Sequence, residues 1–577
     1  MKKLIQELKR RNVFKETIAY LVVAWLVLQV LAIVLPIWNA PNWILQIITI
    51  SLALGLPLWI AFSWHYQFSS SGIRKTKNLS TQKKSSKLNR ILNTTIIIAL
   101  LAVICLIWIN PSLVTVKPTD KLSIAILPFS NTREDPDSDF LGVALVDEII
   151  GELSYAKDIL VRPSSAVRKY ADKIVDAPTA GTELNVNYVL VGNYLIEGDV
   201  IRMNFELVEV QSNDLVWGEK IEADYQNAFQ MQDIVSEKVL NGLKLRFSDE
   251  ESQLRKIDIS EDPLAYEYYL RALAQPGTPQ GNQMAINLLN KSVELDSLFA
   301  PIWSELGWRV KQLGAFNIGE GHQIEDAEQL LQKALNLNSE LPSALANLAA
   351  IYVETGRTEK AIETARHVLS INPNSAENHY VLGYAYRYAG FLEEEEKEQE
   401  IALSIDNNNP RLRAVMSMTK IYQGKLNEAL EILEFNNEIP YFLAWQGQVH
   451  LRLNNDERAL ELFNKVIEMD QQGVGKWVSS MKYHLEGKPE LGRQALEILE
   501  INLVDAEQYY NLANLYGLLG YKADCIRTLR ETVNRGFFCY PVFENDKFLD
   551  SVRSEPGFQE ILGEVKTKHD EFGKQYF

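Results

Sequence analysis

Four acidic residues follow the first apolar segment of the acidic part of the chain. Glu134, Asp135, Asp137 and Asp139 lie in "SNTREDPDSDF", between a strand-like run and a helical pattern. Many nucleotide-binding domains begin with strand, loop and helix, but their loops supply glycine and a helix N-terminus free of negative charge. These acids would repel phosphate. We expect Asp137 and Asp139 to stabilise the helix start. A magnesium or calcium site is the alternative, although the loop lacks the ligand spacing of an EF-hand.

Other residues that could carry chemistry are scattered along the chain. None of the seven histidines lies in an HExxH motif, and the three cysteines form no CxxC motif. GxSxG, Walker and kinase signatures are also missing from the sequence. We therefore expect no enzyme activity, no catalytic residues, no cofactor and no metal. A bridge between Cys525 and Cys539 is the alternative to two buried thiols.

Charge is divided unevenly along the chain. The formal net charge is −17, yet the first 117 residues contain fourteen Lys and Arg against two acids. The rest of the chain is therefore strongly acidic. Its excess of acids would repel phosphate, which binds where Lys and Arg replace its counterions, so we expect no nucleic-acid partner.

Three uncharged apolar runs lie in the basic part, at about 18–38, 43–64 and 91–109. Each is near the ~20 residues that cross a bilayer as a helix. Basic residues flank the first run and fill the loop before the third. By the positive-inside rule the N-terminus is cytoplasmic and the C-terminal domains are periplasmic, in a multi-pass protein of a bacterial inner membrane. This predicts a membrane anchor over residues 1–117, with the lipid bilayer as a partner.

Residues 121–247 have the pattern of a small α/β domain. The apolar run 122–129 predicts a buried strand, and 137–155 has helical spacing. "DILVRP" predicts a second short strand. Three extended segments separated by Gly-Asp and Asn-Asp turns then predict an antiparallel meander, and an amphipathic helix follows.

Residues 263–530 contain internal repeats of the tetratricopeptide (TPR) type. A small residue, a glycine seven positions later and an alanine twelve positions later recur, as in Ala349, Gly356 and Ala361. Small residues let two helices cross closely, and the glycine reverses the chain. Since one pair cannot bury its apolar face, pairs stack into a superhelix, here of six to eight pairs. A single helical bundle is the alternative. Residues 531–577 break the period and predict a C-terminal helical cap.

A superhelix of this kind offers a concave groove lined by the first helix of each pair. Tyr and Arg are the usual anchors of protein interfaces. Side chains there that stacking does not need are candidates for partner binding, with packing between repeats as the alternative: Tyr380, Tyr384, Arg387, Tyr388, Gln448, Arg452, Tyr510 and Asn514. The run "EEEEKEQE" from Glu393 predicts a solvated outer helix face.

Several segments resemble one family of bacterial inner-membrane proteins. "ELKRRNVFKETIAYLVVAWLVLQV" is similar to its N-terminus, and "SIAILPFSN", "LVDEIIGELS" and "RPSSAVRKY" are similar to its TolB-like region. The resemblance implies a multidomain fold with three parts. These are an α-helical anchor of three transmembrane spans, a small α/β TolB N-terminal-like domain and an all-α TPR superhelical solenoid.

The expected function is a non-enzymatic protein-interaction scaffold or sensor that binds protein or peptide partners in the TPR groove. Two alternatives remain open. One is a cell-envelope assembly factor, and the other is a nucleotide-binding or enzymatic α/β domain.

Overall fold

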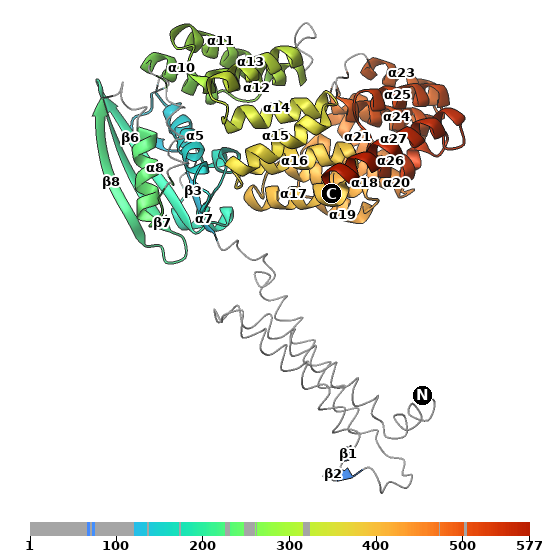
Figure 1. Cartoon of the computed structure of the whole chain (residues 1–577), viewed down its shortest axis with the longest axis horizontal. Coiled ribbons are helices and arrows are strands. Elements are labelled where there is room, and N and C mark those ends of the chain that lie inside the picture. Colours follow the sequence, from blue (N-terminus) through green and yellow to red (C-terminus); the bar gives the residue numbers. More distant parts are fainter. Residues whose placement is uncertain are drawn as a thin grey trace. The chain divides into compact units, whose positions relative to one another are not determined.

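The computed structural model consists of two compact units, Met1–Thr119 and Asp120–Phe577 (Figure 1). The residues it describes are 66–69, 72–75, 121–135, 138–171, 173, 175–224, 231–246, 248, 260, 262–315, 323–471, 473–500, 503 and 505–577. In the first unit, β1 (Tyr66–Ser69) and β2 (Gly72–Lys75) form an antiparallel pair.

The predicted fold class needs correction at its N-terminal part. In the portion of the chain that the structure describes, no helix combines the length and the apolar character needed to cross a bilayer. The predicted spans at 18–38, 43–64 and 91–109 lie outside that portion. The fold class that is supported is an all-α solenoid with a small α/β region.

The α/β region is built on one mixed sheet with the order β5-β3-β6-β7-β8, and β4 pairs with β6. Its strands are β3 (Leu122–Ile126), β4 (Ser130–Asn131), β5 (Ile159–Val161), β6 (Tyr188–Glu197), β7 (Val200–Glu209) and β8 (Leu215–Asp224). Strand β3 is parallel to β5 and β6, whereas β6, β7 and β8 are antiparallel, as the turn signals predicted. The central position of β3 explains its apolar run, because Ile124, Ala125 and Ile126 are fully buried.

The helices of this region are α5 (Leu141–Ser154), α6 (Ser164–Val167), the 3-10 helix η3 (Arg168–Tyr170), α7 (Ala177–Leu184) and α8 (Met231–Gly242). Helix α5 buries Leu141, Leu145, Ile149 and Leu153, which recur at helical spacing. The sequence pattern therefore located this helix and its buried face.

The second half is a succession of helix pairs that runs from α10 to α25 (Figure 1). Their bounds are α10 (Pro263–Leu273), α11 (Pro279–Leu295), α12 (Ala300–Ala315), α13 (Gln323–Leu337), α14 (Pro342–Glu354), α15 (Thr358–Ile371), α16 (Ala376–Ala389), α17 (Leu392–Ile405), α18 (Pro410–Tyr422), α19 (Leu426–Leu433), α20 (Pro440–Arg452), α21 (Asp456–Met469), α22 (Val474–Leu485), α23 (Pro489–Glu500), α24 (Ala506–Leu519) and α25 (Lys522–Asn534).

Small residues and turn glycines set the geometry of these pairs. Ala361 and Ala365 on α15 are fully buried. Gly390 ends α16 with φ +88°, in the left-handed region that glycine tolerates best. The repeat spacing read from the sequence is therefore the spacing that the packing requires.

The C-terminal segment comprises α26 (Tyr540–Asn545), the 3-10 helix η5 (Lys547–Leu549) and α27 (Pro556–Tyr576). It covers the last pair and also reaches helices far back in the chain. The Phe538 N–H donates to the Tyr388 carbonyl oxygen over 2.9 Å, and His569 Nδ1 lies 2.7 Å from the Ala389 carbonyl oxygen. Figure 1 shows α26 and α27 near α16.

The turns after α14 and α25 also touch each other. A Cβ atom on Gly536 would lie 2.2 Å from the Cα atom of Gly356, so neither position has room for a side chain. The solenoid therefore closes on itself through its tail.

Candidate functional site

A cavity of about 410 Å³ lies among the first helices of the later repeats. Its lining residues come from α16, α18, α20, α22 and α24, from the end of α23 and from the segment between α23 and α24: Tyr380, Tyr384, Arg387, Val415, Met418, Tyr441, Trp445, Trp477, Leu499, Leu503, Asp505, Glu507, Gln508, Asn511, Leu512 and Leu515. Its volume lies within the range of sites that bind small ligands or single side chains of a partner.

Aromatic rings form much of the wall of this cavity. The Trp445 ring lies 5.0 Å from the Trp477 ring and 6.1 Å from the Tyr441 ring, measured between centroids. Tyr441 and Trp477 are half-buried, so parts of their surfaces stay accessible. Such rings supply apolar area with little side-chain entropy to lose on binding.

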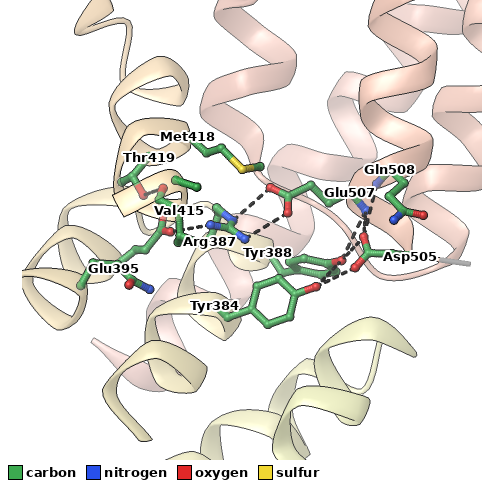
Figure 2. A network of polar contacts seen from close by, with 12 residues as sticks. Tyr384, Arg387, Tyr388, Glu395, Val415, Met418, Thr419, Asp505, Glu507 and Gln508 are labelled. Atoms are coloured by element: carbon green, nitrogen blue, oxygen red, sulfur yellow. Dashed lines mark hydrogen bonds and ion pairs between the residues drawn. The ribbon is translucent and has the colours of Figure 1, made fainter. Parts of the chain in front are cut away.

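A buried ion cluster, shown in Figure 2, contributes Arg387 and Glu507 to the lining of this cavity. Arg387 on α16 donates to Glu395 on α17 and to Glu507 on α24, over 3.0 Å in each case. The Arg387 and Glu395 side chains are 3% and 0% exposed, so neither charge is solvated by bulk water. The cluster joins helices that lie more than a hundred residues apart in the sequence, and each charge is held by its partners.

Two tyrosines fix a further carboxylate beside this cluster (Figure 2). The Tyr384 and Tyr388 hydroxyls donate to the two oxygens of Asp505 over 2.6 Å each. Asp505 also caps α24 by accepting from the backbone N–H groups of Glu507 and Gln508. Burial, and then the charge of Asp505, raise the pKa of both tyrosines well above the ordinary value, so both remain hydrogen-bond donors.

The acidic run at Glu393 is less solvated than its sequence predicted. Glu393 is exposed, but Glu395 is fully buried against Arg387. One arginine serves two buried carboxylates, so the cluster favours a proton on one of them. Burial raises the pKa of Glu395 from 4.5 to about 8, and the pair with Arg387 offsets only part of this effect. Burial also raises the pKa of Glu507.

A pH-dependent stability follows from the Glu395 carboxyl. Between pH 4.5 and about 8 the folded chain holds a proton that the unfolded chain releases. Stability contributed by this group is therefore present at low pH and is lost as pH rises, by about 1 kcal/mol per pH unit within the window. We expect Glu395→Gln to make the free energy of unfolding depend less on pH in this range. Urea unfolding of the variant and of the unaltered chain from pH 5 to 8 measures the difference. The same pH dependence in Glu395→Gln and in the unaltered chain would contradict a raised pKa for Glu395. Glu393→Gln, at an exposed position, is the matched control.

The structure brings together only some of the residues predicted for the groove. Tyr380, Tyr384 and Arg387 line the cavity. The other five do not line it: Tyr388, Gln448, Arg452, Tyr510 and Asn514. Burial alone does not separate the two sets, because Tyr384 and Arg387 are 5% and 2% exposed and the other five at most 6%. In the structure this second set packs within the chain, and partner binding by these residues stays a prediction.

The chain's own tail, residues 537–548, contacts four members of the second set. Arg452 and Asn514 both donate to Asp546, over 3.0 and 2.9 Å. The Tyr510 hydroxyl donates to the Val542 carbonyl oxygen over 3.2 Å. The Tyr388 ring packs on Phe537 at 5.1 Å. Residues 537–548 therefore occupy the part of the concave surface that the sequence assigned to a partner.

Sequence reasoning missed several cavity residues. Tyr441 and Trp445 lie six and two positions before Gly447 of the repeat pattern. Their spacing of four places them on one face of α20, and this could have been read from the sequence. Asp505 and Glu507 gave no such signal, because their partners on α16 and α17 are distant in the sequence.

The acidic loop after β3 has a different role from the one predicted. Asp139 accepts from the Asn131 side-chain amide over 2.7 Å and from the Asp135 backbone N–H over 3.1 Å, so it closes the loop. Helix α5 has Phe140 at its N-cap and receives no side-chain cap. Asp137 lies outside the described residues. Within the described part of the chain, no three His, Cys, Asp or Glu side chains are grouped to hold a metal ion. Cys525 and Cys539 are buried free thiols.

Comparison with protein families defines the two regions. Residues 320–383 and 441–472 match tetratricopeptide repeats, so the solenoid is a TPR solenoid and supports a protein-interaction scaffold. Residues 119–238 match the second domain of HilA/YgeH-like transcriptional regulators. This match replaces the TolB-like assignment that the sequence segments suggested.

Three individual proteins show how far the similarity extends. The chain is 28% identical over 152 residues to the putative adenylate cyclase 3 of Rhizobium meliloti (strain 1021), covering 26% of each protein. It is 35% identical over 91 residues to the photosystem I assembly protein Ycf3 of Synechococcus sp. (strain CC9605), covering 16% of this chain and 52% of that protein. The crystal structure of TTC0263, a thermophilic TPR protein of Thermus thermophilus, is 20% identical, with a TM-score of 0.27. That match covers 30% of this chain and 93% of the other.

The chain thus spans about a quarter and about half of the two curated relatives, so their whole activities are not assigned to it. The predicted inner-membrane location, with a cytoplasmic N-terminus and periplasmic C-terminal domains, stays a prediction.

Proposed function

We propose that this chain is a non-enzymatic scaffold or sensor that holds a segment of a partner polypeptide in the cavity lined by α16, α18, α20, α22 and α24. The observation that carries this proposal is that the tail fills part of the concave TPR surface while the aromatic-walled cavity stays unfilled. Partly accessible aromatic side chains in a formed cavity are typical anchors of polypeptide recognition.

The α/β region supports a sensory role alongside the scaffold. Its family is described as part of transcriptional regulators, which favours regulation over chemistry. Arg162, which follows β5, donates to the carbonyl oxygens of Ser404, over 2.7 Å, and Ile405, at the end of α17. Helix α17 also carries Glu395, so one helix links the α/β region to the ion cluster at the cavity.

Site-specific crosslinking in cells tests the proposed function. A photoreactive phenylalanine replaces Trp477 in the cavity wall of the full chain, and the matched control replaces Met284, which is 54% exposed on α11. We expect a discrete crosslinked polypeptide from the cavity position only. Its crosslinked segment, made as a peptide, should bind the purified full chain in calorimetry, and Trp477→Ala should weaken that binding by about tenfold.

Two results would contradict the proposal. One is equal crosslinking from both positions, and the other is no binding of the identified segment by the purified chain. The identity of the partner also separates a signalling scaffold from a cell-envelope assembly factor.

A further inference from the structure

We propose that the cavity takes a basic side chain, Lys or Arg flanked by apolar residues, of the partner polypeptide. The half-buried rings of Tyr441 and Trp477 would contact the cation, and Asp505 would supply its counter-charge. The inference rests on the proposed function and adds the chemistry of the partner's anchor residue.

Charge is the first reason. The charged residues that line the cavity are Arg387, Asp505 and Glu507, and Arg387 is already held by Glu395 and Glu507. Asp505 accepts from two tyrosine hydroxyls and from backbone N–H groups, all of which are neutral donors. Among the ion pairs of the described residues, none joins a basic side chain to Asp505. Asp505 is half-buried, so it presents an uncompensated carboxylate at the cavity wall.

The aromatic wall is the second reason. A cation over an aromatic face is stabilised by about 0.5–2 kcal/mol, and more as water is removed. The faces of Tyr380 and Tyr384 are already used, by Arg411 at 4.4 Å and Arg387 at 5.1 Å. In the described part of the chain no such cation lies over Tyr441, Trp445 or Trp477. Trp445 is only 3% exposed and packs against both other rings, so the half-buried Tyr441 and Trp477 remain for a cation that enters from outside.

The remaining lining residues select the form of the ligand. Val415, Met418, Leu512 and Leu515 supply apolar surface for the methylene stem of a Lys or Arg side chain and for its apolar neighbours. An acidic ligand would meet Asp505 and Glu507. A wholly apolar ligand would remove water from Asp505 without replacing its interactions, which is costly. A basic side chain in an apolar context avoids both costs.

A peptide series tests the anchor residue. Fluorescein-labelled acetyl-Gly-Ala-Leu-X-Leu-Ala-Gly peptides, with X as Arg, Lys, Met or Glu, are titrated with the full chain and followed by anisotropy. We expect the Arg and Lys peptides to bind about tenfold more tightly than the Met peptide, and the Glu peptide to bind most weakly. Asp505→Asn should weaken the Arg peptide about tenfold and leave the Met peptide within about twofold. Asparagine keeps the cap of α24.

The controls separate the inference from the proposed function. Asp570→Asn, at an exposed position on α27, should change no affinity. If Asp505→Asn does not fold, Trp477→Leu takes its place and should weaken the Arg peptide more than the Met peptide. If the Met peptide binds as tightly as the Arg and Lys peptides, or more tightly, the inference of a basic anchor residue is wrong. The proposed scaffold function would still stand, because the crosslinking experiment tests it separately. Failure of every peptide to bind also overturns the basic anchor.

Discussion

Replacing Arg387 with methionine is expected to destabilise the solenoid by about 3–5 kcal/mol. The substitution keeps an unbranched apolar stem but removes the guanidinium, and so leaves Glu395 and Glu507 buried without a cation. Because a buried charge without a partner costs far more than a buried pair contributes, the effect should exceed that of any exposed ion pair. Urea unfolding of the full chain, followed by tryptophan fluorescence, measures the change.

The double variant Arg387→Met with Glu507→Gln distinguishes this explanation from a simple loss of packing. Removing the orphaned charge should restore part of the stability that the single variant loses. Arg458→Met is the matched control, because its side chain is 46% exposed and pairs with Glu461 on the same helix. We expect a change within about 0.5 kcal/mol for this control. A loss below about 1 kcal/mol for Arg387→Met would contradict the buried cluster.

Replacing Asp546 with alanine is expected to loosen the C-terminal tail and to cost about 3–5 kcal/mol. The Asp546 carboxylate accepts from Arg452, Asn514 and Tyr510, and from the backbone N–H of Phe548. The Arg452 and Asp546 side chains are each 7% exposed, so the variant leaves a buried guanidinium without its counter-ion.

Hydrogen exchange of the full chain separates tail release from global unfolding. In Asp546→Ala, amides of residues 537–549 should lose protection while those of the α/β sheet keep theirs. Asp550→Ala is the control, since Asp550 is exposed and forms its ion pair with Arg553, three positions along the chain. Unchanged protection in the tail would show that Asp546 does not hold it in place.

Local patterns predicted the elements well, and the reasons are visible in particular residues. The β3 run is apolar at four of its five positions because the strand lies between two other strands and is buried in the core. Gly390 marks the end of α16 because it adopts a positive φ there. Such features depend on neighbours within one turn or one strand.

Local sequence patterns could not predict the ion cluster of Arg387, Glu395 and Glu507. Glu395 lies within a run of acids that reads as a solvated helix face, and only its neighbours in space make it a buried partner of Arg387. Glu507, the second partner, is 120 residues away from Arg387 in the sequence. The family of the α/β region was also misjudged, since similar strand and helix orders occur in more than one family.

By itself the sequence determined that this chain contains an α/β region and stacked TPR helix pairs, because strand alternation, helical spacing and turn glycines are local properties. The tertiary structure alone decided which part of the concave surface remains unfilled. Residues 537–548 pack onto Arg452, Tyr510 and Asn514, and they leave the cavity beside Trp445, Trp477 and Asp505 unfilled. That outcome depends on contacts between segments distant in the sequence, which no periodic pattern records.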